Sequence, residues 1–96
     1  MTYDLDCRYD TRKSFYGKAR VRVSEDGKHK ELISYTTKVA DILITDYDVI
    51  YTTEGHYSAT TTRHQREFFL QNGLDEKSVK KLFKDGKLVE PIFSPE

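Results

Sequence analysis

The 96-residue sequence contains a single cysteine, Cys7, so an internal disulfide is excluded and a reducing compartment is favoured. It contains no apolar run of membrane-spanning length, and no charged-then-apolar signal peptide opens it. It also has no excess of either charge, because sixteen Lys and Arg residues balance sixteen Asp and Glu residues. Net charge therefore gives no argument for nucleic acid or membrane as a partner. We expect a cytoplasmic protein without a membrane partner, and the sequence leaves its oligomeric state open.

The clearest segment of the chain is residues 58–73, for which the sequence predicts a central helix. Ser58 is a suitable N-cap because its hydroxyl can accept a backbone N–H of the first turn. Phe68 and Phe69 fall on one stripe at helical spacing, which predicts a buried face. Gly73 can end the helix, since glycine adopts the left-handed conformation without strain.

A second, shorter helix is predicted over residues 75–86. Asp75 is its N-cap, and an apolar stripe recurs at spacings of three and four, at Val79, Leu82 and Phe83. Residues 87–96 form a tail that can start as an edge strand. Pro91 and Pro95 prevent this strand from extending further.

Before the central helix, the sequence predicts a polar lead-in over residues 1–13 and a β-meander over residues 14–57. Strict alternation and turn residues such as Asp26-Gly27 predict three strands, over residues 14–24, 30–44 and 49–53. The second strand is long and changes register, which predicts a β-bulge near residues 39–41. The sequence therefore predicts a single α+β domain over residues 1–96: an antiparallel meander of three or four strands with two helices packed on one face.

Tyrosine and acidic residues gather in the middle of the sequence, where residues 31–60 carry five acidic residues and one basic residue. Tyrosine often carries interface energy, and an acidic patch suits a basic groove on a partner. The predicted partner-binding residues are Asp41, Asp46, Tyr47, Asp48, Tyr51, Glu54 and Tyr57.

The first predicted strand offers a different surface. Tyr16, Lys18, Arg20 and Arg22 alternate onto one face, at a spacing of about 7 Å. Basic residues interleaved with an aromatic residue can bind the backbone and bases of a nucleic acid strand. The alternative interpretation is the solvent face of a half-buried sheet, where lysine and arginine are common.

Metal binding and catalysis have less support in the sequence. The candidate zinc ligands are Cys7, His56 and His64. No tight pair of ligands such as Cys-x-x-Cys is present in the sequence. The alternative interpretation is that His64 bonds a backbone group beneath the sheet. No nucleophile signature, paired-carboxylate site or glycine-rich phosphate loop occurs, so we expect a protein that is not an enzyme.

Three stretches of the chain are similar to a family of small proteins encoded by phages and mobile elements of Gram-positive bacteria. They are Ser14-Phe-Tyr-Gly-Lys-Ala19, Ser34-Tyr-Thr-Thr-Lys-Val-Ala40, and Tyr57-Ser-Ala-Thr-Thr-Thr-Arg-His-Gln-Arg-Glu-Phe68 continuing to Gly73. This chain departs from the pattern at Thr62 and Gln65, where apolar residues are expected.

The resemblance implies a phage-encoded accessory protein that binds a component of the bacterial host cell. Small phage proteins of this kind include anti-CRISPR inhibitors of type II effectors. We therefore expect an inhibitor that binds a Cas9-type nuclease directly through the acidic, tyrosine-bearing residues. The alternative is a nucleic-acid-associated phage protein that uses the basic strand face and the lysine-rich last helix.

Overall fold

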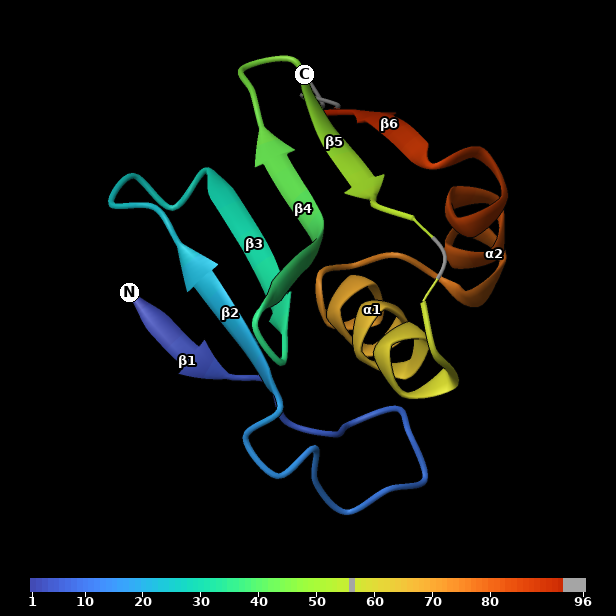
Figure 1. The fold of residues 1–96 in the computed structure, drawn as a ribbon. Helices are drawn as coiled ribbons and strands as arrows, with labels where there is room; N and C mark the ends of the chain where they lie inside the picture. The colour runs from blue at the N-terminus through green and yellow to red at the C-terminus, as the bar shows by residue number, and fades with distance from the viewer. Residues whose placement is uncertain (56, 93–96) are drawn as a thin grey trace.

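The computed structural model describes residues 1–55 and 57–92 of the chain. Its strands form one antiparallel sheet in the order of the sequence (Figure 1). They are β1 (Thr2–Asp4), β2 (Ala19–Val23), β3 (His29–Ser34), β4 (Thr37–Ile44), β5 (Asp48–Thr53) and β6 (Lys87–Pro91). The helices α1 (Ala59–Gln71) and α2 (Glu76–Asp85) connect β5 to β6. The predicted α+β class is confirmed, whereas the predicted number of strands was too small.

Both helices begin at the N-caps that the sequence predicts. The Ser58 hydroxyl accepts the backbone N–H of Thr61, and the Asp75 carboxylate accepts that of Ser78. Gly86 ends α2 with a φ of 78°, a left-handed conformation that glycine adopts without strain. Within the described ranges, no helix is long and apolar enough to cross a membrane.

The long strand predicted over residues 30–44 is wrong, because the chain reverses in its middle. Ser34 lies opposite Thr37 in the β3–β4 ladder, so Tyr35 and Thr36 form a two-residue turn. Tyr35 has a φ of 58°, which a bulky residue rarely adopts. The turn contains none of the glycine or asparagine residues that usually mark such a reversal.

The predicted bulge is present in β4. Leu32 pairs with Ala40 while Ile33 pairs with Lys38, which leaves Val39 as the extra residue. The bulge lets Val39 and Ala40 both lie buried although they are neighbours in the sequence.

The first strand is shorter than predicted and the lead-in is more ordered. Tyr16 and Gly17 both have positive φ, so the chain turns there and β2 begins only at Ala19. Within the lead-in, β1 pairs with β2, and Leu5 is buried. At the other edge, β6 pairs with β5, as predicted for the start of the tail.

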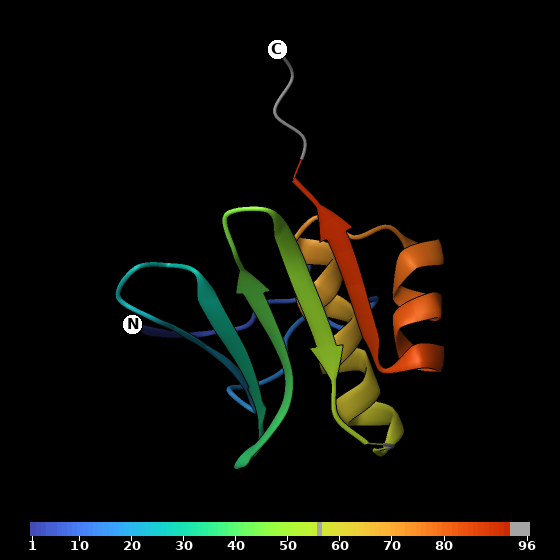
Figure 2. The ribbon, with the colours of Figure 1, turned by 90° about the horizontal axis from the view of Figure 1, so that it is seen from above.

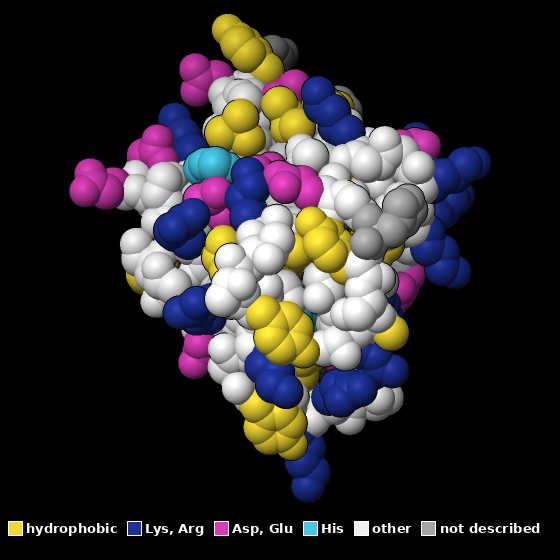
Figure 3. Space-filling view, in the orientation of Figure 1, with side chains coloured by type: hydrophobic (Ala, Val, Ile, Leu, Met, Phe, Trp, Pro, Cys, Tyr) yellow, Lys and Arg dark blue, Asp and Glu magenta, His cyan; other side chains and the backbone are white. Residues whose placement is uncertain are grey.

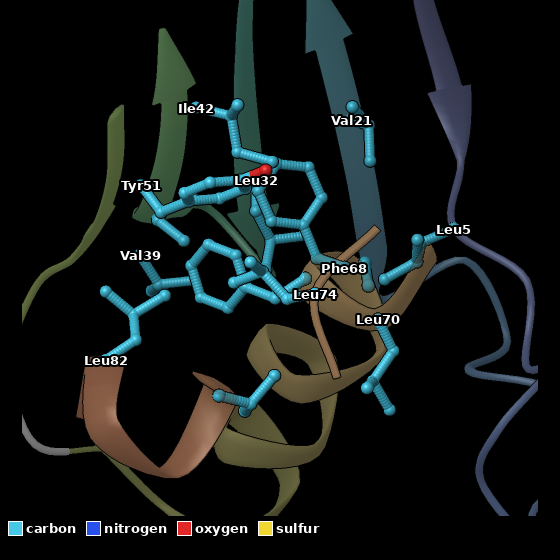
Figure 4. Packing of buried hydrophobic residues seen from close by; sticks show 14 of the residues in the cluster. Leu5, Val21, Leu32, Val39, Ile42, Tyr51, Phe68, Leu70, Leu74 and Leu82 are labelled. Atoms are coloured by element: carbon cyan, nitrogen blue, oxygen red, sulfur yellow. The ribbon is translucent and has the colours of Figure 1, made fainter. Parts of the chain in front are cut away.

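Both helices lie on the same side of the curved sheet (Figures 1 and 2). Phe68 and Phe69 of α1 and Leu82 of α2 are fully buried among side chains from the inner face of the sheet (Figure 4). Each buried side chain of this size contributes about 1.5–3 kcal/mol relative to full exposure. This core fixes α1 across β3 and β4, and so positions the residues at the start of the helix.

Candidate functional site

Three separate segments meet at one end of the molecule and line a pocket of about 100 Å³ that opens to the surface. We call it the basic pocket. The β1–β2 loop, the β3–β4 turn and the start of α1 supply its lining residues: Arg12, Ser14, Phe15, Tyr16, Lys18, Tyr35, Thr60, Arg63 and His64. Figure 3 shows dark-blue basic and yellow side chains gathered at this lower end of the molecule.

Buried hydrogen bonds hold the inner end of the basic pocket together. The Ser34 hydroxyl on β3 lies 2.8 Å from His64 Nδ1 and 3.0 Å from the Thr61 hydroxyl, both on α1. The Phe15 ring packs against the His64 ring in an edge-on arrangement, with 4.6 Å between centroids. His64 is 1% exposed, so this ring and Phe15 close the inner end.

Glu67 fixes the β1–β2 loop to α1. Its side chain is fully buried, and one carboxylate oxygen accepts the backbone N–H groups of Tyr9 and Asp10, at 2.9 and 3.1 Å. The other oxygen accepts the Gln71 side-chain amide at 2.6 Å. A buried carboxylate is tolerated only when its acceptor sites are filled in this way. The loop that carries Arg12, Tyr16 and Lys18 is therefore anchored on the helix.

The charges around the basic pocket are mainly positive. Arg12, Lys18 and Arg63 line it, and none of the lining residues in the described part of the chain is acidic. Outside the lining, Asp10 Oδ1 lies 3.2 Å from Arg63 Nη1 and neutralises part of this charge. Burial lowers the pKa of His64 below its ordinary value, and the positive charges of Lys18 and Arg12 lower it further, against a smaller opposing effect of Asp10. Both cations therefore act on the inner end of the pocket.

Two strained tyrosines stand at the basic pocket. Tyr16 and Tyr35 have φ angles of 53° and 58°, and they are the two non-glycine residues with positive φ in residues 1–55 and 57–92. A left-handed backbone costs an ordinary residue about 1–2 kcal/mol. Both side chains are exposed, at 76% and 48%. Strain of this kind is often kept where a side chain has a binding role.

The predicted basic strand face is divided between two cavities. Arg20 and Arg22 are exposed on β2 and line a groove of about 390 Å³, together with Thr2, Ile33, Thr36 and Lys38. Tyr16 and Lys18 instead belong to the turn before β2 and line the basic pocket. The groove and the pocket lie on either side of the β3–β4 turn, because the neighbouring residues Tyr35 and Thr36 line one each.

No pattern in the sequence predicts that four further residues line this pocket, because they come from segments far apart in the chain. These residues are Arg12, Tyr35, Thr60 and Arg63. One signal was present. The three stretches that carry the family resemblance supply every lining residue of the basic pocket except Arg12.

The acidic residues predicted to bind a partner do not form one patch. Tyr51 is 7% exposed and packs edge-on against Phe69, which corrects the prediction that it faces a partner. Asp41 and Glu54 both pair with Lys38, at 3.1 and 3.2 Å.

The remaining members of that set lie at opposite ends of β5. Asp46 and Tyr47 occupy the β4–β5 turn, and Asp48 begins β5. The Asp48 carboxylate accepts the Thr45 hydroxyl, and Tyr47 is 82% exposed. Tyr57 follows the other end of the strand and is 39% exposed.

The zinc hypothesis stays a prediction, because His56 lies outside the described residues. Among residues 1–55 and 57–92, no three His, Cys, Asp or Glu side chains lie close enough together to hold a metal ion. Cys7 is half-buried, and burial followed by the charges of Glu67 and Asp10 raises the pKa of its thiol.

The lowered pKa of His64 predicts that the fold loses stability in mild acid. The unfolded chain takes up a proton at His64 near the ordinary pKa of 6.5, whereas the folded chain does so only at lower pH. The free energy of unfolding should therefore fall as pH drops below about 6.5. Urea unfolding at pH 7.5 and 5.5 should show a smaller loss for His64→Asn, which keeps a polar atom near the Ser34 hydroxyl, than for the wild type. Equal losses in the two proteins would contradict the assignment to His64.

Comparison with known proteins gives a family but no described activity. Residues 3–85 match the model of a family of unknown function, DUF8033. No curated protein and no solved structure matches the chain. The matched stretch includes every residue of the basic pocket and both helices. Because it covers most of the sequence, the chain belongs to DUF8033, a family of unknown function.

Proposed function

We propose that this protein binds single-stranded nucleic acid at the basic pocket and the adjoining groove. The observation that carries the proposal is the meeting of three cationic side chains and two exposed, strained tyrosines around one pocket without an acidic lining residue among those described. Proteins that bind single strands combine positive grooves, which contact phosphates, with aromatic side chains, on which bases stack.

The tyrosines supply the stacking surfaces in this proposal. Tyr16 and Tyr35 project from turns, and their positive φ angles cost free energy. At Tyr16 no buried side-chain contact offsets this cost, since the residue is 76% exposed. Stacking on a base contributes about 1–3 kcal/mol by alanine substitution, enough to offset that cost in the complex. Lys18 Nζ lies 6.0 Å from the Tyr35 ring centroid, so a phosphate next to a stacked base would meet a positive charge.

The groove gives the strand a path beyond the basic pocket. It begins on the far side of the Tyr35–Thr36 turn and carries Arg20, Arg22 and Lys38 on its walls. Arg22 pairs with Glu31 at 3.1 Å. Lys38 lies within 4 Å of three carboxylates, those of Glu31, Asp41 and Glu54, and therefore adds little net positive charge to the groove. In this proposal the groove contributes weaker phosphate contacts than the pocket.

Inhibition of a Cas9-type nuclease stays a prediction with one supporting observation. Tyr47 is 82% exposed at the tip of the β4–β5 turn, beside the exposed Asp46, and so offers a small tyrosine–acid contact to a partner. A DNA cleavage assay with purified Cas9 and guide tests this hypothesis. Inhibition that Tyr47→Ala and Asp46→Lys remove would support it, and full cleavage across several Cas9 orthologues would contradict it.

Reversing charge at the basic pocket should abolish nucleic acid binding. The variant Arg12→Glu/Lys18→Glu and the matched control Lys80→Glu/Lys81→Glu on α2 change the net charge by the same amount. In fluorescence anisotropy with an internally labelled 12-nucleotide strand, the first variant should lose binding and the control should retain it. Wild-type affinity should fall with salt, with a logarithmic slope of about −0.7 for each phosphate neutralised.

Equal losses in the two double variants would show that only overall charge matters. No binding by the wild type at low salt, to DNA or to RNA, would contradict the proposed function.

Replacing Tyr16 with glycine should separate binding from stability. Glycine accepts the positive φ at this position, so relief of strain offsets the entropy cost, and Tyr16→Gly should unfold within about 1 kcal/mol of the wild type. The same change removes a stacking surface and should weaken strand binding about tenfold or more. Tyr47→Ala, at an exposed tyrosine far from the pocket, is the control and should leave affinity unchanged. If Tyr16→Gly binds as tightly as the wild type, Tyr16 is not a stacking residue.

A further inference from the structure

The size of the basic pocket limits what can enter it. Its volume is about 100 Å³, whereas pockets for drug-sized ligands and cofactors hold about 300–1,000 Å³. A whole nucleotide therefore does not fit inside, and one small group does. The lining cations make that group an anion, and the anion that a nucleic acid carries is phosphate.

The small volume and buried base of the pocket favour the end of a strand over its middle. Phe15 and His64 are 4% and 1% exposed and close the inner end. A phosphodiester within a strand has a chain leaving it on both sides, so it needs the room of a larger cavity such as the groove of about 390 Å³ lined by Arg20 and Arg22. A phosphate at a strand end has a chain on one side only and can enter a pocket with room for one small group.

The charges fit a terminal phosphate as well. A phosphate monoester carries about −1.5 to −2 charges at pH 7, compared with −1 for a phosphodiester. Arg12 and Lys18 supply two positive charges, and Arg63 supplies a third that Asp10 partly neutralises. The net positive charge of the pocket therefore matches a monoester more closely than a diester.

His64 adds a directed polar group at the closed end. Its Nδ1 atom lies 2.8 Å from the Ser34 hydroxyl, and His64 lines the pocket, so in the tautomer with the proton on Nε2 the ring can donate a hydrogen bond to an anion there. The side chain is buried and its ring is held between Phe15 and Ser34, which fixes its direction. A ligand at the base of this cationic pocket would therefore meet a ring of fixed direction, and pre-organised groups of this kind favour selective recognition of one small group.

We propose that the basic pocket binds the terminal phosphate of a single strand, while Tyr16 and Tyr35 stack on the bases next to that end. This inference rests on the proposed function and names the part of the nucleic acid that the pocket selects. A phosphate at a 5′ end and one at a 3′ end are both monoesters, so the experiment includes both.

The test compares matched ten-nucleotide strands that differ only at one end. Strands with a 5′ phosphate or a 5′ hydroxyl carry the fluorophore at the 3′ end, and a mirrored pair tests the 3′ phosphate. The full-length protein should bind the phosphorylated strand of one pair about 10–100-fold more tightly, the range expected for charge-assisted hydrogen bonds to one buried group. Inorganic phosphate should compete with that strand and much less with its hydroxyl counterpart.

Two single variants locate the selectivity. Arg12→Gln removes a charge at the pocket and should reduce the ratio of the two affinities. Arg20→Gln removes a charge in the groove and should weaken both strands alike, leaving the ratio unchanged. Equal effects of the two variants on the ratio of the two affinities would contradict recognition of the terminal phosphate by the basic pocket.

The outcomes separate this inference from the proposed function. Equal affinities for phosphate and hydroxyl ends, lost in Arg12→Glu/Lys18→Glu, would overturn the terminal-phosphate inference and leave strand binding standing. No binding of any strand would overturn both, and binding of a phosphorylated peptide in that case would show that the phosphate comes from a protein.

Discussion

The buried contact between Ser34 on β3 and the side chains of Thr61 and His64 on α1 is the interaction on which the site depends. It joins the β3–β4 hairpin to the first turns of the helix through distances of 2.8–3.0 Å. Buried polar groups without partners cost free energy, so this contact fixes the rotation of α1 about its axis as well as its position. The same contact holds the His64 ring at the closed end of the basic pocket.

Further buried polar side chains of α1 also bond to partners from other segments. Thr61, His64, Gln65 and Glu67 are all buried, and each meets a partner outside α1, with Thr61 and His64 sharing Ser34. Gln65 donates to the backbone carbonyl of Val39, the extra residue of the β4 bulge, at 2.9 Å. This bond explains why a polar residue stands at Gln65, where the resemblance leads one to expect an apolar one. Glu67 binds the β1–β2 loop, so the helix organises every segment of the pocket.

The sequence predicted the elements whose signals are local. Ser58, Asp75 and Gly86 mark helix ends by their own chemistry, and the change of register near Val39 revealed the bulge. It did not predict the Tyr35–Thr36 turn, because tyrosine carries no preference for a positive φ. One long predicted strand therefore concealed a hairpin, and the strand count was too low.

The site was harder to predict than the fold for the same reason. The sequence pattern predicts a basic surface that includes Tyr16 and Lys18, but as a strand face shared with Arg20 and Arg22. The turn at Tyr16 directs them into a pocket whose other walls come from Arg63 and His64, more than forty residues later. Alternation along one segment cannot reveal such a meeting, since it depends on how the helix packs across the sheet.

The most direct test of this account is an amide chemical-shift map of the ¹⁵N-labelled protein, titrated with a short single strand. The shifts should concentrate in the three segments around the basic pocket, at residues 12–18, 34–36 and 60–64, and then continue into the β2 face of the groove. Little change is expected along α2, although that helix carries four lysines. Shifts confined to α2 or to the β4–β5 turn would contradict the central claim that this pocket is the functional site.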